Sequence, residues 1–320
     1  MFARRLRLTS ESVEKKGFAE GFWSKDEVKD VFLDQQRRFM WNKDYWRNIL
    51  VPLLALKQNS AVLDVGCGLG FLGQNLAEFV PNGKIIGVDL DAKLVETAKK
   101  IAESAFPHHV FDYRVGSAYE LPVENDSVDL SICQTLLMHL EDPMKVISEM
   151  KRVTKKGGKV VAIEPDFASM SYFDTAVEKM NYSVDQRTNF WRWETIRKLG
   201  KKKLGKGDDD IGTKTPYLFF KSGLQVTGVR CFDRVFWLIP PYQQEGNDLE
   251  LKQMLLSPEF YFDTLDTRTE FLAGSGTEEE YEEYLALLKK EYEIRQQQIK
   301  EKTYISLMVQ TLTITIGEKT

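Results

Sequence analysis

The sequence has little cysteine and little histidine, with three of each among 320 residues. The cysteines, Cys67, Cys133 and Cys231, lie far apart and form no Cys-x-x-Cys pair. This spacing argues against a disulfide framework and against a structural zinc site. The histidines add no cluster of metal ligands. We therefore expect a protein without a bound metal, in a reducing compartment, which we take to be the cytoplasm.

Long apolar runs and a strong net charge are also missing. No apolar stretch approaches the length that spans a membrane. The chain begins with basic residues, but they are not followed by the apolar segment that a secretory signal needs. Glu11 and Glu14 weaken a reading of that start as a transit peptide. The net charge of −4 does not predict a nucleic-acid partner. The strongest charge run, 197–210, is expected to be a solvated loop, with a phosphate or RNA contact as the alternative.

Residues 60–165 alternate between apolar strand patterns and helical patterns. This alternation predicts βαβ units, and hence an α/β fold with a parallel sheet covered on both faces. The expected strands are 61–66, 84–90, 109–116, 128–137 and 159–165, and the expected helices are 71–80, 92–105 and 143–158.

Largely helical segments flank and interrupt this core. Capping boxes at Ser24/Glu27 and Thr277/Glu280 mark two helix starts, and Glu141 and Asp142 are expected to cap the helix that begins near Pro143. We predict a helical N-terminal lid over 1–58, a core over 59–240 in which 168–222 is partly lid, a helical insertion over 241–301, and a final core strand within 302–320. Such insertions form either a lid over a site or an oligomer interface, such as that of a homodimer.

Three glycines, Gly66, Gly68 and Gly70, follow the first predicted strand. They allow a ligand to approach the backbone, and the helix that follows offers free N–H groups to an anionic group such as a carboxylate. The last glycine of the dinucleotide fingerprint is replaced by Phe71, which weakens a nicotinamide reading. The alternative is a tight turn that binds nothing.

Asp89 ends the second predicted strand, about 20 residues beyond the glycines, where an acidic side chain can accept hydrogen bonds from both hydroxyls of a ribose. The alternatives are that Asp89 is a solvated loop residue or that Asp91 takes this role.

Together these residues resemble the class I S-adenosylmethionine-dependent methyltransferases. Asp64, Gly66, Cys67, Gly68 and Gly70 match the family's first motif, D-x-G-C-G-x-G. Asp89 matches its acidic residue, and 116–165 is similar to its central block. Within this family, the sequence most resembles the ubiquinone-biosynthesis-like group of small-molecule methyltransferases. The resemblance implies a Rossmann-like, seven-stranded, mostly parallel sheet with helices on both faces, with 219–229 leading into the sixth strand and 304–317 forming an antiparallel seventh.

The resemblance also implies S-adenosyl-L-methionine as the cofactor. The glycine turn would hold the methionine part, and Asp64 would orient that turn or reach the methionine amino group through water. Asp89 would bind the ribose, and Leu90 would pack on the adenine.

Three further residues complete the implied cofactor site. Ser117 and Ala118 would approach the adenine edge. Ser117 stands where the family often has an acidic residue, so the backbone of Ala118 takes more of that role. Gln134 would offer its backbone carbonyl to the methionine amino group.

Methyl transfer mainly requires that the acceptor, the methyl group and the sulfur lie in line. If the acceptor must lose a proton, His139 is the candidate base, although it also suits a packing role. Glu164 could face the substrate or bind neighbouring backbone, and the sequence leaves this open.

We therefore expect methyl transfer to O, N or C of an aromatic or hydrophobic small molecule, without a membrane or nucleic-acid partner. The alternatives are a tRNA or protein methyltransferase, a non-catalytic cofactor-binding module, and an aminopropyl transferase of the same fold.

Overall fold

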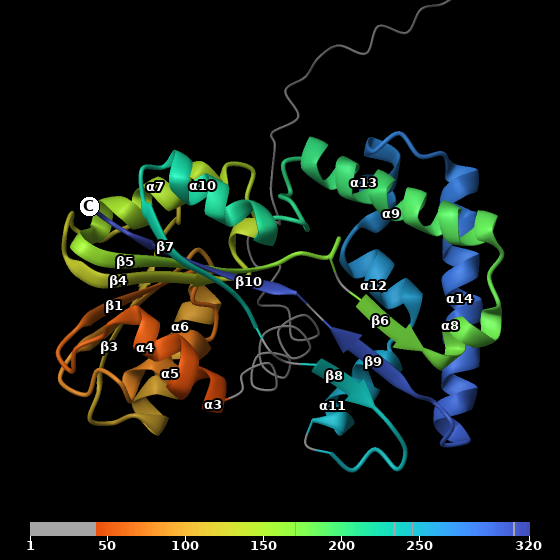
Figure 1. Ribbon diagram of the computed structural model, residues 1–320, viewed down its shortest axis with the longest axis horizontal. Coiled ribbons are helices and arrows are strands. Elements are labelled where there is room, and N and C mark those ends of the chain that lie inside the picture. The colour runs from red at the N-terminus through yellow and green to blue at the C-terminus, as the bar shows by residue number, and fades with distance from the viewer. Residues whose placement is uncertain (1–42, 170, 233–234, 245, 310) are drawn as a thin grey trace, which may run out of the picture.

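The computed structural model describes residues 43–169, 171–232, 235–244, 246–309 and 311–320. Figure 1 shows two lobes side by side, a larger sheet with its helices and a mainly helical lobe. The predicted capping box at Ser24 and Glu27 lies outside the described residues. Among the described helices, none has the length and apolar character needed to cross a membrane.

A seven-stranded sheet forms the first lobe, in the order β3-β2-β1-β4-β5-β10-β7. The first five strands pair in parallel, and β10 pairs antiparallel with both β5 and β7. This arrangement confirms the predicted fold class, including the antiparallel strand near the C-terminus. The strands are β1 (Ala61–Val65), β2 (Lys84–Asp89), β3 (Val110–Val115), β4 (Val128–Gln134), β5 (Thr154–Pro165), β7 (Gln225–Cys231) and β10 (Leu312–Glu318).

Helices cover both faces of this sheet because the central strands are apolar on both sides. In β1, Val62 joins one buried cluster and Leu63 the other, as expected of a strand buried on both faces. The first cluster holds η2 (Trp46–Leu50), α4 (Val51–Leu54) and α5 (Phe71–Ala77), and the second holds α7 (Pro143–Val153) and α10 (Thr215–Lys221). Before η2 lies α3 (Lys43–Tyr45), and α6 (Ala92–Ala105) packs on β2 and β3.

Several of the predicted boundaries differ in the structure. The strand expected over 128–137 ends at Gln134, and the helix expected over 71–80 ends at Ala77. The helix expected over 143–158 ends at Val153, because Thr154 already begins β5. The strand expected over 304–317 is two strands, β9 (Ser306–Val309) and β10, which belong to different sheets.

The second lobe combines a three-stranded antiparallel sheet with six helices of the described chain. Its sheet has the order β6-β9-β8, from β6 (Ser171–Asp174), β9 and β8 (Val235–Leu238). The capping box predicted at Thr277 and Glu280 is present. The helices are α8 (Thr175–Met180), α9 (Val184–Lys203), α11 (Asn247–Met254), α12 (Pro258–Thr264), α13 (Thr267–Ala273) and α14 (Glu278–Lys300).

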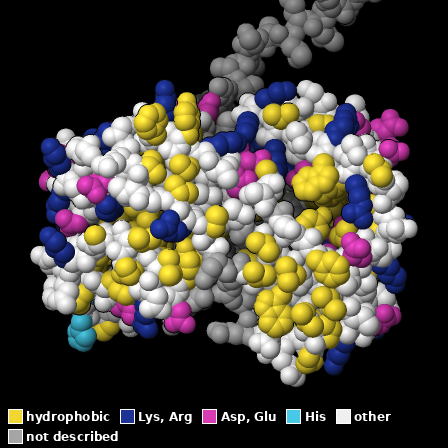
Figure 2. All heavy atoms as spheres, viewed as in Figure 1, with side chains coloured by type: hydrophobic (Ala, Val, Ile, Leu, Met, Phe, Trp, Pro, Cys, Tyr) yellow, Lys and Arg dark blue, Asp and Glu magenta, His cyan; other side chains and the backbone are white. Residues whose placement is uncertain are grey.

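The small sheet continues three strands of the large one. β6 follows β5 in the chain, β8 follows β7, and β9 precedes β10, so the order β6-β9-β8 repeats the order β5-β10-β7. The helical lobe is therefore joined to the core beside the end of β5. Figure 2 shows hydrophobic side chains gathered over β8 and β9 of this lobe, where Phe173, Leu307 and Trp237 lie opposite one another and are 37–47% exposed.

Helices α9 and α13 cross with their backbones in direct contact. A Cβ atom on Gly200 would lie 1.6 Å from the carbonyl oxygen of Glu270, and one on Gly274 would lie 1.9 Å from that of Ile196. Only glycine fits at either position.

We predict that Gly200→Ala lowers the free energy of unfolding by about 1–3 kcal/mol, because the two helices must move apart. Urea denaturation followed by circular dichroism measures this loss. Gly228→Ala in β7 is the matched control, since its Cβ would lie 3.6 Å from the nearest atom, a side-chain carbon of Ile316. Equal stability of the two variants would contradict the crossing described above.

Candidate functional site

The three glycines form a tight turn at the end of β1. All have left-handed backbone, with φ of +69° at Gly66, +53° at Gly68 and +78° at Gly70. The N–H groups of Gly66 and Cys67 both donate to the carbonyl oxygen of Val88, at 2.8 and 3.1 Å. The turn is thereby fixed against the end of β2.

The surroundings of these glycines differ in a way that indicates where a ligand could lie. A Cβ on Gly66 would be 2.8 Å from Leu136 Cδ1, and one on Gly70 would be 2.3 Å from the hydroxyl of Tyr113. A Cβ on Gly68 would meet nothing within 4 Å. Gly66 and Gly70 are therefore enclosed by protein, whereas open space lies beside Gly68.

Two carboxylates hold the turn from either side. Buried Asp64 accepts a hydrogen bond from the N–H of Gly73 at 3.1 Å and so orients the start of α5. Asp89 accepts from the N–H of Gly68 at 2.8 Å with one oxygen and from the N–H of Asp91 at 2.9 Å with the other. A carboxylate oxygen has two lone pairs, so one carboxylate can bind backbone N–H groups and ribose hydroxyls at the same time.

The other predicted cofactor contacts lie on the same edge of the sheet. Leu90 is 58% exposed, although it directly follows a buried strand. The hydroxyl of Ser117 accepts a hydrogen bond from the N–H of Tyr119 at 3.2 Å. It thus stabilises the local turn that contains Ala118. The side chain of Cys67 is buried with Val95 and Tyr113, so a ligand would meet its backbone rather than its thiol.

Gln134 ends β4 next to the glycine turn. Because Val65 lies opposite Cys133 in the parallel pairing, the next residue, Gln134, lies beside Gly66. Its carbonyl oxygen accepts from the hydroxyl of Thr135 at 2.8 Å, and Thr135 has a left-handed backbone with φ of +46°.

Glu164 binds neighbouring backbone, which answers the question that the sequence left open. It is fully buried and accepts from the N–H groups of Leu136 and Leu137, at 3.0 and 2.8 Å, and of Met138, at 3.3 Å. It thus fixes η3 (Leu137–His139), the short 3₁₀ helix that follows β4.

His139 lies where this short helix meets the loop after α9. The N–H of Asp208 donates to the carbonyl oxygen of Met138 at 3.0 Å. A Cβ on Gly207 would lie 2.1 Å from that same oxygen. The helical lobe therefore reaches the core edge through 207–208, directly beside His139.

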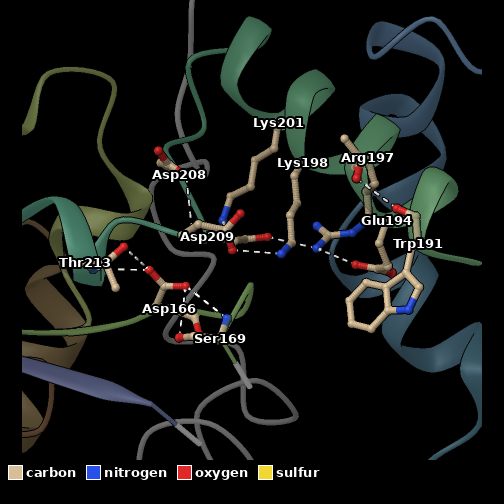
Figure 3. A network of polar contacts seen from close by, with 12 residues as sticks. Asp166, Ser169, Trp191, Glu194, Arg197, Lys198, Lys201, Asp208, Asp209 and Thr213 are labelled. Carbon is tan, nitrogen blue, oxygen red and sulfur yellow. Dashed lines mark hydrogen bonds and ion pairs between the residues drawn. The ribbon is translucent and has the colours of Figure 1, made fainter. Parts of the chain in front are cut away.

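Other acidic residues near the edge stabilise local structure. Asp142 caps α7 by accepting from the N–H of Lys145 at 3.1 Å, as the sequence predicts. Asp166 accepts from the N–H groups of Thr213 and Ser169, both at 3.2 Å, and from the Thr213 hydroxyl (Figure 3). Among the described residues, no three His, Cys, Asp or Glu side chains gather as ligands of a metal ion.

Comparison with known proteins agrees with this geometry. Residues 56–207 match a family model described as a methyltransferase domain. The chain is 33% identical over 128 residues to an uncharacterised methyltransferase of Schizosaccharomyces pombe, and 32% identical over 155 residues to the demethylmenaquinone methyltransferase of Halalkalibacterium halodurans. These alignments cover 38% and 48% of this chain.

The fold agrees with a solved structure. A Bacillus halodurans protein described as a candidate methyltransferase superposes with a TM-score of 0.52 at 19% identity, over 87% of this chain and 100% of that one. The chain therefore contains a methyltransferase domain over residues 56–207, and its fold is that of the superposed structure. It spans about half the length of the curated relatives named above, 46% of the Schizosaccharomyces protein and 61% of the Halalkalibacterium enzyme.

The basic run at 197–206, in contrast, is largely paired with carboxylates of the same chain (Figure 3). Arg197 pairs with Asp209 at 2.9 Å and with Glu270 at 3.1 Å, and Lys201 pairs with Asp209 in a buried contact. Other pairs include Lys198–Asp210 at 2.7 Å, Lys202–Asp208 at 2.8 Å and Lys206–Asp266 at 3.0 Å. Most of the run belongs to α9 rather than to a solvated loop, and Lys203 binds the carbonyl oxygen of Ala273 instead of a carboxylate.

The network shifts the pKa values of its two buried carboxyls in opposite directions. Burial favours the neutral acid at Asp209, but Lys201 and Arg197 outweigh it and lower the pKa of Asp209 to about 2. At Glu270, burial dominates over Arg197 and Lys206, and the pKa is raised.

We predict that Asp209→Asn destabilises the protein at neutral pH by about 2 kcal/mol or more, since an unpaired buried cation remains. The folded-state pKa is lower than the unfolded value of about 3.9, so this carboxylate stabilises the fold above about pH 4. Its contribution is lost as the pH falls towards 2. Thermal unfolding of both proteins between pH 2 and 7 measures the difference. A difference that stays constant down to pH 2 would contradict this assignment.

Proposed function

We propose that the protein transfers a methyl group from S-adenosyl-L-methionine to a flat, largely apolar small molecule. The observation that carries this proposal is the arrangement of the glycine turn and Asp89. A left-handed turn with open space at Gly68 is hydrogen-bonded to a carboxylate at the end of the next strand, and exposed Leu90 follows it. A backbone cradle, a ribose acceptor and an apolar platform therefore lie together at the carboxyl ends of β1 and β2.

The bound cofactor would supply an activated methyl group on a sulfonium centre. The protein must hold the acceptor in line with that methyl and keep water away from it. The helical lobe suits this task, because 207–208 packs on Met138 beside the turn. We propose that the part of 168–222 that precedes α10 acts, with 241–301, as the lid on the acceptor side. His139 is our candidate base for an acceptor that must lose a proton.

The acceptor class rests on the names of the relatives. Several of them are named demethylmenaquinone methyltransferases, including one from Bacillus velezensis that is 27% identical over 90% of its length. These names favour a ring-containing, apolar acceptor.

The rival proposal, a tRNA or protein methyltransferase, needs a recognition surface beyond the single basic cluster at 197–206. That cluster gives it little support, because Arg197, Lys198, Lys201, Lys202 and Lys206 all have carboxylate partners.

Incubation of the protein with a metabolite extract and methyl-labelled S-adenosylmethionine tests the proposal. We expect label in a small, solvent-extractable product that survives nuclease and protease treatment. Label that is lost on nuclease or protease treatment would instead assign an RNA or protein acceptor. The absence of both label transfer and cofactor binding would overturn the proposal.

We predict that Asp89→Ala weakens binding of S-adenosylhomocysteine by about 100-fold, because hydrogen bonds to the ribose and the link to Gly68 are lost together. Isothermal titration calorimetry measures the affinity. Asp112→Ala is the matched control, since this carboxylate on the adjacent strand β3 pairs with Arg114. If both variants bind as tightly as the wild type, the ribose does not lie on Asp89.

A further inference from the structure

Among the described residues, the buried side chain of Gln134 has no hydrogen-bond partner. The residue is 2% exposed, and both its amide oxygen and its amide nitrogen are unpaired in this part of the chain. Most buried polar groups in proteins are hydrogen-bonded, and an unpaired buried amide destabilises the fold by a few kcal/mol. Its position at the end of β4, next to the glycine turn, favours a bound ligand as the partner.

The strand alternation places this amide on one face of the sheet. Leu130 and Ile132, the alternate residues before it in β4, belong to the cluster that contains Tyr45 and Trp46. Side chains of alternate residues share a face of a strand, so Gln134 extends towards that aromatic side. The amide is thus the polar group at the end of an otherwise apolar row.

The direction of the side chain separates it from the cofactor contact expected of the same residue. Backbone carbonyls lie in the plane of a sheet, whereas side chains stand roughly perpendicular to it. The backbone carbonyl of Gln134 lies in the plane of the sheet and points towards Gly66. Its side-chain amide extends from the face of the sheet that packs against Trp46. A ligand at the glycine turn and a ligand on the amide therefore occupy different volumes.

We propose that the amide of Gln134 binds an oxygen atom of the acceptor, a hydroxyl or carbonyl on its ring system. This inference rests on the proposed function and names the residue that distinguishes acceptors. A neutral amide can donate to a carbonyl or exchange both bonds with a hydroxyl. A site with a buried polar group rejects an analogue that cannot pair with it.

The test compares two ring compounds of nearly equal size, 1-naphthol and 1-methylnaphthalene. Equilibrium dialysis measures their affinity for protein saturated with S-adenosylhomocysteine. The wild type is expected to bind 1-naphthol more tightly by about tenfold or more. In Gln134→Met, whose side chain is similar in length, we expect the preference to disappear.

Two further measurements separate this role from a structural one. Gln134→Met removes an unpaired amide, so its melting temperature without ligand should be unchanged or higher than that of the wild type. Its affinity for S-adenosylhomocysteine should also be unchanged. Ser131→Ala is the matched control, because Ser131 is likewise buried without a partner in β4 but lies opposite Leu63 and belongs to the other face. It should keep the preference for 1-naphthol.

Each other outcome overturns the inference in a recognisable way. A lower melting temperature of Gln134→Met would assign the amide to the fold, and weaker binding of S-adenosylhomocysteine would assign it to the cofactor. A wild type that does not prefer 1-naphthol would exclude the oxygen contact. A wild type that binds no S-adenosylhomocysteine would refute the proposed function itself, and the inference with it.

Discussion

The left-handed turn after β1 is the constraint on which the rest of the site depends. A backbone with three positive φ angles in five residues favours glycine at each of them, and contacts with the neighbouring strands and helix stabilise it here. Val88 accepts two N–H groups of the turn, Asp64 fixes the helix that follows, and Asp89 binds the N–H of Gly68. Among the three glycines, open space lies beside Gly68 alone in the described part of the chain, and a ligand can touch the backbone there.

The position of the helical lobe follows from the strands rather than from a flexible tether. β5, β7 and β10 each connect directly to a strand of the small sheet, so the lobe is joined to the core at three places beside the edge that carries the site. The ion pairs around Arg197 and Asp209 then fix the loop after α9. That loop binds the carbonyl oxygen of Met138 in the short helix η3, and Glu164 accepts a hydrogen bond from the N–H of the same residue. One of the places where lobe and core meet is therefore η3, which carries His139.

Much of the fold could be predicted from the sequence because its signals are local. The alternation of strand and helix in 60–165, the capping residue Asp142 and the capping box at Thr277 each depend on a few neighbouring residues. The division of 304–317 into two strands could not be predicted, because both halves have the same β-forming pattern and only the pairing partners differ. The hydrogen-bond and ion-pair partners of Glu164 and Arg197 could not be predicted either, because they are distant in the sequence. Glu270, for example, lies 73 residues from Arg197. The three aspartates at 208–210 were a local signal that the basic run neutralises itself, and this signal was available in the sequence.

The central claim is that the glycine turn, Asp89 and the end of β4 form one cofactor site with the acceptor on the side of Gln134. A crystal structure of the protein with S-adenosylhomocysteine tests it most directly. The account predicts the ribose hydroxyls within hydrogen-bonding distance of the Asp89 carboxylate, the homocysteine part along Gly66–Gly70, and its sulfur directed towards the end of β4. Ligand density away from the ends of β1 and β2, with Asp89 still bound only to backbone, would contradict it.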